Sequence, residues 1–293
     1  MAARIMSSIC VAHLIRRGND AGCLERFLQS YRKHPAGIDH ELIFLLKGFP
    51  VGYLDSEIES LIGNVRHECL WVPDLGYDVE TYWLLVQQIV SDYYCFLNSF
   101  SEILAPDWLA KIHANVSKEG IGIAGATGSW ESLYQDLLDA AEEIVQRRGA
   151  AVFFHPRHAL NWLRLVAKSG FRRAQFDPFP NPHLRSNAFM VSLSIARQLR
   201  IGKVRSKENA WKLESGLRGI TSQIRAMGKQ AIVVGREGVG YEWRRWADSK
   251  TFWQGRQEGL LVADNQTRRY QEATVQQRQE LARLAWGGER IGK

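Results

Sequence analysis

The sequence lacks the features that mark membrane-spanning and disulfide-rich proteins. No apolar run approaches the ~18 residues that a membrane-spanning helix needs. Only four cysteines occur in 293 residues, none with C-x-x-C spacing, and Cys10, Cys69 and Cys95 lie in apolar runs. We therefore expect buried, reduced thiols rather than disulfides or a metal site. The N-terminal residues lead into a strand without a cleavage-site pattern, so we expect no signal peptide and a cytoplasmic location.

A phosphate-binding fingerprint is also missing. Dinucleotide-binding folds carry G-x-G-x-x-G after the first strand, whereas this chain reads RRGNDAG at residues 16–22. The sequence also has no internal repeat, no low-complexity linker and no obvious domain boundary. We therefore expect residues 1–293 to form a single domain that is not a plain dinucleotide-binding fold.

The charge of the chain is unevenly distributed. The formal net charge is +7, and residues 201–293 hold 18 Lys and Arg against 10 Asp and Glu, a balance of +8. Such a region can face nucleotide phosphates, nucleic acid or an anionic membrane surface, or it can be a solvated helical surface. Because its cations are dispersed among Gln, Glu and Trp rather than clustered, we expect no nucleic-acid partner.

Apolar runs that read as strands alternate with amphipathic helices through the first half of the chain. This order predicts an α/β fold with a doubly wound, mostly parallel central sheet flanked by helices. Since hydrophobic residues make up 45% of the chain, a sizeable core can form. We expect strands at 9–14, 41–46, 69–72 and 93–97, and helices at 23–34, after Asp55 and at 80–90.

The second half gives weaker signals. Strands are expected at 120–126, 183–192 and 230–234, and helices at 131–148, 211–227 and 266–286. Prolines punctuate residues 153–182, so we expect an irregular segment there. Within the helix at 211–227, the run KLESG (residues 212–216) is expected at the start.

Residues 92–109, DYYCFLNSFSEILAPDWL, are the segment most suggestive of a binding site. They read as a buried strand that stops on Asn98, Ser99 and Ser101, followed by a helix that begins near residue 106. In parallel α/β sheets, ligands lie beyond the carboxyl ends of such strands. The same pattern is also compatible with a buried strand and turn that have no catalytic role.

Several short motifs occur in the order found in one enzyme family. The series FLN…P-x-W-L…GxxGxxGS, followed by FPNPHLRSNAFMVS and KLESG, resembles GT-A glycosyltransferases of family 2. The resemblance spans residues 9–246 and looks like the type used in bacterial surface polysaccharide synthesis, such as rhamnan or O-antigen assembly. It implies transfer of a sugar from a nucleotide-sugar donor to a glycan or lipid-linked acceptor, with inversion. Residues 1–130 would bind the donor, and residues 131–293 would bind the acceptor and supply the C-terminal helices.

The family's metal motif is replaced in this chain. Its members end the central strand with an Asp-x-Asp motif that holds Mn²⁺ or Mg²⁺, but here Asn98-Ser99-Phe100 stands in that place, with only Glu102 nearby. Hard divalent cations need carboxylate oxygens, so we expect no metal ligands here. A metal-free enzyme would need cationic side chains or helix N-termini to neutralise the leaving diphosphate.

The resemblance also implies the residues of the site. Glu214, in the KLESG run, is the candidate catalytic base, and Asp177 is the second candidate. Each residue also has a purely structural interpretation: Glu214 as a Glu at a helix N-terminus, where it interacts favourably with the helix dipole, and Asp177 as an ordinary turn residue before Pro178. Contacts to the nucleotide-sugar are expected from His13, Lys47, Gly76, Asp78, Asn98, Ser99 and Ser101.

The acceptor would contact two further groups of residues. His183, Arg185 and Asn187 alternate on the strand expected at 183–192, so their side chains would share one face. Arg185 can clamp a phosphate or carboxylate, or it can form a structural ion pair. Trp243 and Trp246 lie in EWRRW, which resembles the Q-x-x-R-W motif of processive synthases, and either stack on a sugar or pack a core.

Two other interpretations follow from the same residues. A GT-A domain without its metal motif can act as a non-catalytic partner in a polysaccharide-assembly complex. The basic C-terminal third also allows peripheral association with the cytoplasmic face of a membrane.

Overall fold

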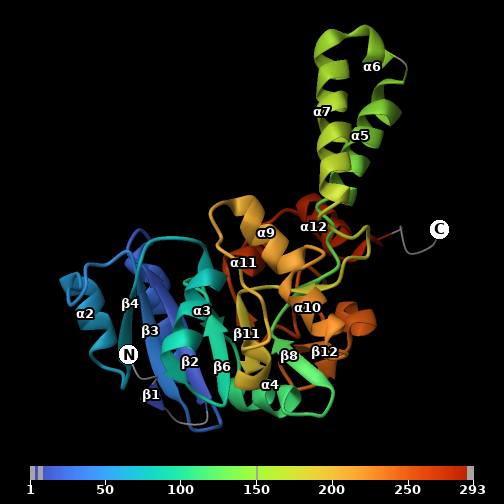
Figure 1. The fold of residues 1–293 in the computed structure, drawn as a ribbon. Helices are drawn as coiled ribbons and strands as arrows, with labels where there is room; N and C mark the ends of the chain where they lie inside the picture. Colours follow the sequence, from blue (N-terminus) through green and yellow to red (C-terminus); the bar gives the residue numbers. More distant parts are fainter. Residues whose placement is uncertain (1–3, 6–8, 150, 289–293) are drawn as a thin grey trace.

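The protein has an eight-stranded mixed sheet, ordered β13-β12-β8-β11-β6-β2-β3-β4, that passes through both halves of the chain (Figure 1). A computed structural model describes residues 4–5, 9–149 and 151–288. Strands β4, β3, β2 and β6 are parallel, β11 is antiparallel to β6 and β8, and β12 is parallel to β8. The strands of this sheet are β2 (Ile9–Arg16), β3 (Glu41–Lys47), β4 (Glu68–Val72), β6 (Tyr93–Leu97), β8 (Ile121–Gly125), β11 (Ala188–Ser192), β12 (Gln230–Val234) and β13 (Gly240–Tyr241).

Helices cover both faces of the sheet, because successive strand side chains point to opposite sides. In β2, Ile9 and Val11 join one core cluster, whereas Cys10 and Ala12 join the other. The first cluster packs under α1 (Ala21–Lys33), α2 (Ser56–Ile62) and α4 (Trp108–Val116). The second packs under α3 (Asp78–Gln88), α9 (Lys207–Ser215), α10 (Ile220–Ala226) and α12 (Val275–Trp286). The predicted α/β architecture is therefore confirmed.

The direction of winding reverses between β2 and β6. From β2 the chain proceeds to β3 and β4 on one side, then crosses to β6 on the other side of β2. At such a reversal the loops beyond the two strands diverge and leave a crevice at the carboxyl end of the sheet. The loops after β2 and β6 flank this position.

The strand expected at 183–192 is interrupted by a turn. Its first part, β10 (His183–Leu184), pairs with β9 (Gly128–Ser129), and only β11 enters the large sheet. Between them, the backbone N–H of Arg185 donates to Thr127 O, and that of Ser186 to Glu214 Oε1. Because these donors bond outside the sheet, the expectation that His183, Arg185 and Asn187 share one strand face is wrong.

The helix expected at 211–227 is two helices, α9 and α10. They are separated at Gly216 and Gly219, where an added Cβ would meet backbone carbonyl oxygens at 2.5 and 2.9 Å. Glu214 is therefore next to the last residue of α9 rather than at a helix start, which corrects the sequence-based placement. The helix expected at 266–286 is likewise divided, into α11 (Asn265–Glu272) and α12, where Thr274 caps a new N-terminus.

The segment expected to be irregular is mostly helical, so that prediction is wrong. Residues 135–173 form a hairpin that projects from the body of the protein (Figure 1). Its helices are α5 (Gln135–Arg148), α6 (Ala151–Phe154) and α7 (Pro156–Arg173). Pro156 does not interrupt α7, because it occupies the first helical turn, where a missing N–H costs no hydrogen bond.

Shorter elements complete the chain. They are β1 (Arg4–Ile5) beside β5 (Ile89–Val90), β7 (Glu102–Ile103) beside β14 (Val262–Ala263), the helix α8 (Leu193–Ala196) and the 3₁₀ helix η1 (Trp243–Ser249). Among the residues that the structure describes, no helix is long and apolar enough to cross a membrane. The four cysteines are free; Cys10 and Cys95 are buried, and Cys23 and Cys69 are partly exposed.

Candidate functional site

A narrow crevice lies at the carboxyl ends of β2 and β6, where the winding reverses. His13 and Arg16 from the end of β2, Asn19 from the following loop, and Ser99 from the loop after β6 all line it. The crevice has a volume of about 10 Å³, room for about one water molecule. The tertiary structure thus brings together two of the predicted donor contacts, His13 and Ser99, which are far apart in the sequence.

His13 is a buried, neutral imidazole. Its ring stacks on Phe27 of α1 with centroids 3.8 Å apart, and neither ring nitrogen has a hydrogen-bond partner within the described structure. Burial lowers the pKa of His13 from 6.5 to about 3, because the imidazolium form would lose its hydration. At neutral pH the ring can therefore offer one donor and one acceptor, and no charge, to a ligand in the crevice.

Lys47, Gly76 and Asp78 gather at the ends of β3 and β4. The Lys47 ammonium donates to Gly76 O at 2.7 Å. Burial lowers the pKa of Lys47, and the nearby carboxylates of Asp78 and Asp74 oppose this shift. Burial raises the pKa of Asp78 despite the proximity of Lys47, and the charge of Glu214 adds to the increase.

Gly76 has a steric reason to be glycine. Its φ is +68°, and an added Cβ would meet the Glu80 carboxylate at 2.0 Å. Glu80 in turn accepts a hydrogen bond from Val204 N at 2.9 Å. The first turn of α3, which follows Gly76 closely in the sequence, is therefore held against the segment that precedes α9.

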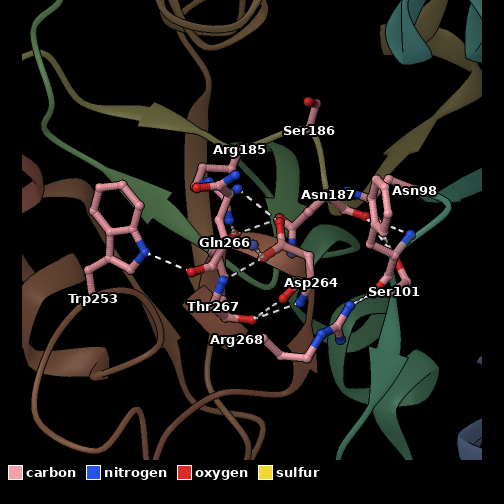
Figure 2. Close-up of polar contacts among 12 residues, drawn as sticks. Asn98, Ser101, Arg185, Ser186, Asn187, Trp253, Asp264, Gln266, Thr267 and Arg268 are labelled. Atoms are coloured by element: carbon pink, nitrogen blue, oxygen red, sulfur yellow. Dashed lines mark hydrogen bonds and ion pairs between the residues drawn. The ribbon is translucent and has the colours of Figure 1, made fainter. Parts of the chain in front are cut away.

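The loop after β6 is a closed turn built around Asn98. Its side-chain Oδ1 accepts from Phe100 N at 3.0 Å and from Ser101 Oγ at 3.1 Å. The backbone N–H of Asn98 donates to Asn187 O at 2.9 Å, and Ser101 Oγ lies 3.2 Å from the same carbonyl (Figure 2). The side chains that replace the expected carboxylates thus stabilise the turn.

The residues of this turn do not fit a divalent cation. Among the residues that the structure describes, no three His, Cys, Asp or Glu side chains are grouped so that they could hold a metal ion. The nearby carboxylate of Glu102 lies 3.2 Å from Arg268 and 4.0 Å from Arg26. Guanidinium groups therefore occupy the surroundings of Glu102, the carboxylate that follows this turn in the sequence.

Arg268 places a cation directly beside the turn. Figure 2 shows Arg268 reaching toward the loop that carries Asn98 and Ser101. Its Nη2 donates to Phe100 O at 3.0 Å and its Nη1 to Glu102 Oε2 at 3.2 Å. It lines a cavity of about 630 Å³ together with Arg26, Phe100 and Arg269. Arg268 could not be predicted as a neighbour of this turn, because α11 lies more than 160 residues away in the sequence.

Glu214 projects from the end of α9 toward the turn before β11. Its Oε1 accepts a hydrogen bond from Ser186 N at 2.6 Å, which orients the carboxylate. Its negative charge acts on the pKa values of Asp78, Glu131 and His183, so these groups face a common region. The charge of the candidate base therefore reaches the donor-side residue Asp78.

Glu131 was not predicted from the sequence. It follows β9, where its backbone N–H donates to Ser129 Oγ at 3.0 Å. Burial raises the pKa of Glu131, Arg185 opposes the shift, and the charge of Glu214 adds to it. Asp177 does not join this group through any contact found among the described residues; its backbone carbonyl accepts from Ser132 Oγ at 2.6 Å.

The predicted acceptor residues make mainly internal contacts. His183 is buried, its Nδ1 lies 2.8 Å from Asn181 O, and burial lowers its pKa although the charge of Glu214 opposes the shift. Asn187 Oδ1 accepts from Thr127 Oγ1 at 2.5 Å. The Nδ2 of Asn187 is buried and has no hydrogen-bond partner within the described structure, so it can donate to a ligand.

Arg185 forms a buried ion pair. Its Nη2 lies 2.8 Å from Asp264 Oδ2, with the two side chains 14% and 0% exposed (Figure 2). Asp264 also caps α11, since its Oδ1 accepts from the backbone N–H groups of Gln266 and Thr267. The guanidinium lies 4.2 Å from the centre of the Phe252 ring. These contacts favour the structural interpretation of Arg185.

The two tryptophans of EWRRW have different environments. Trp246 is fully buried, its indole N–H donates to Tyr241 O at 2.9 Å, and it packs against Gly128. This burial favours the core interpretation of Trp246, which also lines the same cavity as Trp243. Trp243 is half-buried and lines a cavity of about 220 Å³ with Arg244, whose guanidinium lies 4.5 Å from its ring.

Comparison with known proteins finds likeness only among solved structures. No protein-family model matches the chain, and no curated protein sequence matches it. A mannosyltransferase from Pyrobaculum calidifontis, solved with GDP-mannose and Mn²⁺, is 12% identical with a TM-score of 0.44, and the match covers 83% of this chain and 59% of that one. Glucosyl-3-phosphoglycerate synthase from Mycobacterium tuberculosis, solved with Mn²⁺, UDP and phosphoglyceric acid, is 17% identical with a TM-score of 0.39, with coverage of 67% and 60%. The chain thus spans about 60% of the length of these structures, and both are glycosyltransferases, the class that the sequence resembles.

Proposed function

We propose that the protein is a GT-A glycosyltransferase that moves a sugar from a nucleotide-sugar donor to an acceptor hydroxyl, with inversion. The observation that carries this proposal is the position of the Glu214 carboxylate. It is oriented by Ser186 N and acts electrostatically on Asp78 at the donor side and on His183 at the acceptor side. A carboxylate between two such regions can take the proton of an attacking hydroxyl.

The donor would bind across the carboxyl ends of β2, β3, β4 and β6, as ligands do where the winding of an α/β sheet reverses. The nucleoside would lie at the crevice beside His13 and Ser99, near Lys47, Gly76 and Asp78. Because that crevice holds little more than one water molecule, its loops would have to separate to admit a nucleobase. The diphosphate would lie beside the Asn98–Ser101 turn.

Arg268 would supply the charge that stabilises the leaving diphosphate. It is held at the turn by Phe100 O and Glu102, on the wall of the 630 Å³ cavity that also contains Arg26 and Arg269. Guanidinium groups bind phosphate oxygens through paired, charge-assisted hydrogen bonds. Arg268 would thus stabilise the charge that develops as the donor bond breaks.

Glu214 would be the catalytic base, with Asp177 as the second candidate. The hydrogen bond from Ser186 uses Oε1, so Oε2 would receive the proton of the acceptor hydroxyl. As the proton leaves, the hydroxyl oxygen of the acceptor would attack the anomeric carbon of the donor sugar. Asn187 Nδ2 and Trp243 are suitable contacts for the acceptor. Glu131 lies close enough to the same region for its charge and that of Glu214 to interact.

The acceptor would be a glycan or a lipid-linked sugar of a bacterial surface polysaccharide. This part of the proposal rests on the motif resemblance of residues 9–246. Peripheral membrane association through the basic C-terminal third is part of the same proposal and rests on its charge balance of +8. Four of its cations form ion pairs within the protein. These pairs are Arg245–Asp248, Lys250–Glu258, Arg268–Glu102 and Arg283–Asp139.

A non-catalytic scaffold is the second candidate function. The narrow crevice and the absence of a fitting metal ligand set among the described residues favour it. A scaffold would retain the fold and the core contacts but would bind no nucleotide-sugar. The two functions therefore differ in a property that can be measured directly.

The test begins with thermal-shift titration against a panel of nucleoside diphosphates and nucleotide-sugars. For a ligand that binds, release of the nucleoside diphosphate is then measured with glycan and lipid-linked acceptors. Glu214→Gln should preserve folding and donor affinity but reduce turnover by ~10² to 10⁴-fold. The matched variants Asp177→Asn and Glu131→Gln should retain far more activity.

Three results would contradict the proposal. If no nucleotide binds, the scaffold function is favoured. If Glu214→Gln retains near-normal turnover while Asp177→Asn loses it, the base is Asp177. If neither Glu214→Gln nor Asp177→Asn affects a measurable transfer, neither of these two carboxylates acts as the base.

A further inference from the structure

The projecting hairpin of α5, α6 and α7 is anchored firmly at its base. Arg172, buried near the end of α7, donates to Leu133 O at 3.1 Å and forms an ion pair with Glu208 at the same distance. Ser169 Oγ donates to Tyr134 O at 3.1 Å. The hairpin therefore extends from the body as a supported element, with one face of α7 turned away from α5 (Figure 1).

An apolar stripe runs along this outer face of α7. Leu160, Leu163 and Phe171 follow helical spacing and are 48%, 54% and 65% exposed, and Phe154 at the tip is 86% exposed. In 18 residues, α7 spans about 27 Å. The large apolar side chains are thus lined up on one projecting element rather than scattered over the surface.

Cations accompany the stripe, and carboxylates are absent from this part of the sequence. No Asp or Glu occurs between Glu143 and Asp177. The Lys and Arg residues in that interval are Arg147, Arg148, Arg157, Arg164, Lys168, Arg172 and Arg173. Exposed Arg157, Arg164 and Lys168 recur with helical spacing beside the stripe.

We propose that the outer face of the hairpin, defined by Phe154, Leu160, Leu163 and Phe171 with Arg157, Arg164 and Lys168, lies on an anionic lipid bilayer. A helix with an apolar face and flanking Lys and Arg residues binds in the plane of the membrane–water interface. There its apolar side chains contact the acyl chains, and its cations contact the anionic headgroups. Because the hairpin projects from the body of the protein, its outer face can approach a broad surface without obstruction from the central sheet (Figure 1). This proposal goes beyond the glycosyltransferase proposal and does not depend on it.

The test is flotation of the whole protein with phosphatidylcholine vesicles that contain or lack phosphatidylglycerol, at low and high salt. One variant reverses three charges: Arg157→Glu, Arg164→Glu and Lys168→Glu. Its matched control reverses three exposed cations of the body: Arg200→Glu, Lys203→Glu and Arg205→Glu. A second variant, Leu160→Ser, Leu163→Ser and Phe171→Ser, removes the stripe, and Val51→Ser, Leu75→Ser and Val275→Ser form its control.

Wild type should float with the phosphatidylglycerol vesicles and much less with phosphatidylcholine alone, and high salt should weaken binding. The charge variant should bind about 100-fold more weakly, and the stripe variant at least about tenfold more weakly, with both controls near wild type. Circular dichroism should show equal folding, since all substituted residues are exposed.

Several results would overturn the proposal. The first is that wild type fails to bind the phosphatidylglycerol vesicles at low salt, and the second is that neither hairpin variant weakens binding. The third concerns the oligomeric state, which light scattering after size-exclusion chromatography measures. A dimer that dissociates in the stripe variant, without vesicle binding by wild type, would make the outer face an interface between two copies of the chain.

Discussion

Replacing Arg185 with Ala should destabilise the protein substantially, because it would leave a buried carboxylate without its partner. Asp264 is 0% exposed and uses Oδ1 to cap α11, while Oδ2 accepts from Arg185 at 2.8 Å. Removal of one member of a buried ion pair costs about 3–5 kcal/mol. The guanidinium contact with Phe252 is lost in the same variant. We therefore expect Arg185→Ala to lower the free energy of unfolding by about 3–5 kcal/mol.

Urea denaturation monitored by tryptophan fluorescence measures this change. The matched control is Arg245→Ala, because Arg245 and Asp248 form a pair of similar length, 2.9 Å, whose side chains are exposed. Solvent screening limits such a pair to about 0–1 kcal/mol. The difference between the two variants isolates the effect of burial from the effect of losing an arginine.

One result would refute the structural interpretation of Arg185. If Arg185→Ala unfolds within about 1 kcal/mol of wild type, the ion pair contributes no more than an exposed one. Loss of acceptor-dependent turnover in that same stable variant would identify the guanidinium as an acceptor-binding group.

Four further results are expected. Nucleoside diphosphate binding, measured by calorimetry, should survive EDTA because the Asn98 turn lacks carboxylate ligands. Binding that is lost in EDTA and recovered on addition of Mn²⁺ would contradict this prediction. Arg268→Ala should weaken that binding about tenfold or more, whereas an unchanged affinity would remove Arg268 from the donor site. Because the pKa of folded His13 is about 3, the unfolded state takes up its proton first as pH falls. Between pH 7 and pH 5, the free energy of unfolding should thus fall about 2 kcal/mol more in wild type than in His13→Leu; equal losses would contradict the lowered pKa. Trp246→Ala should cost about 3–5 kcal/mol in urea denaturation and Trp243→Ala much less, and similar losses would contradict their different burial.

The regular elements of the first half could be predicted because local patterns determine them. Strands β2, β3 and β6 are continuous apolar runs, which is the pattern of a strand buried on both faces. The helix α1 shows its apolar residues Leu24, Phe27 and Leu28 at helical spacing. Their alternation predicted the mostly parallel sheet, and hence the edge at which a ligand would lie.

Local sequence patterns were ambiguous wherever the same residue type is compatible with two different backbone structures. Pro156 signals a break inside a helix but is favourable in a first turn, so α7 was missed. Gly216 ends α9 and Gly219 precedes α10, and backbone carbonyls approach both closely, a contact that spacing along the chain does not reveal. Glu214 was therefore placed at the wrong end of a helix.

Tertiary structure alone decided which charged groups meet. Arg268 reaches the Asn98 turn, and Asp264 pairs with Arg185, across 166 and 79 residues of sequence, respectively. Neither pairing has a local signal, because the partners lie in the loop after β6 and in the turn before β11, and only the folded chain brings these segments to α11. The sequence by itself determined the layers of the fold and the edge that carries the candidate site, since these follow from periodic burial. The charges at that edge depend on long-range packing, and so only the folded chain defines them.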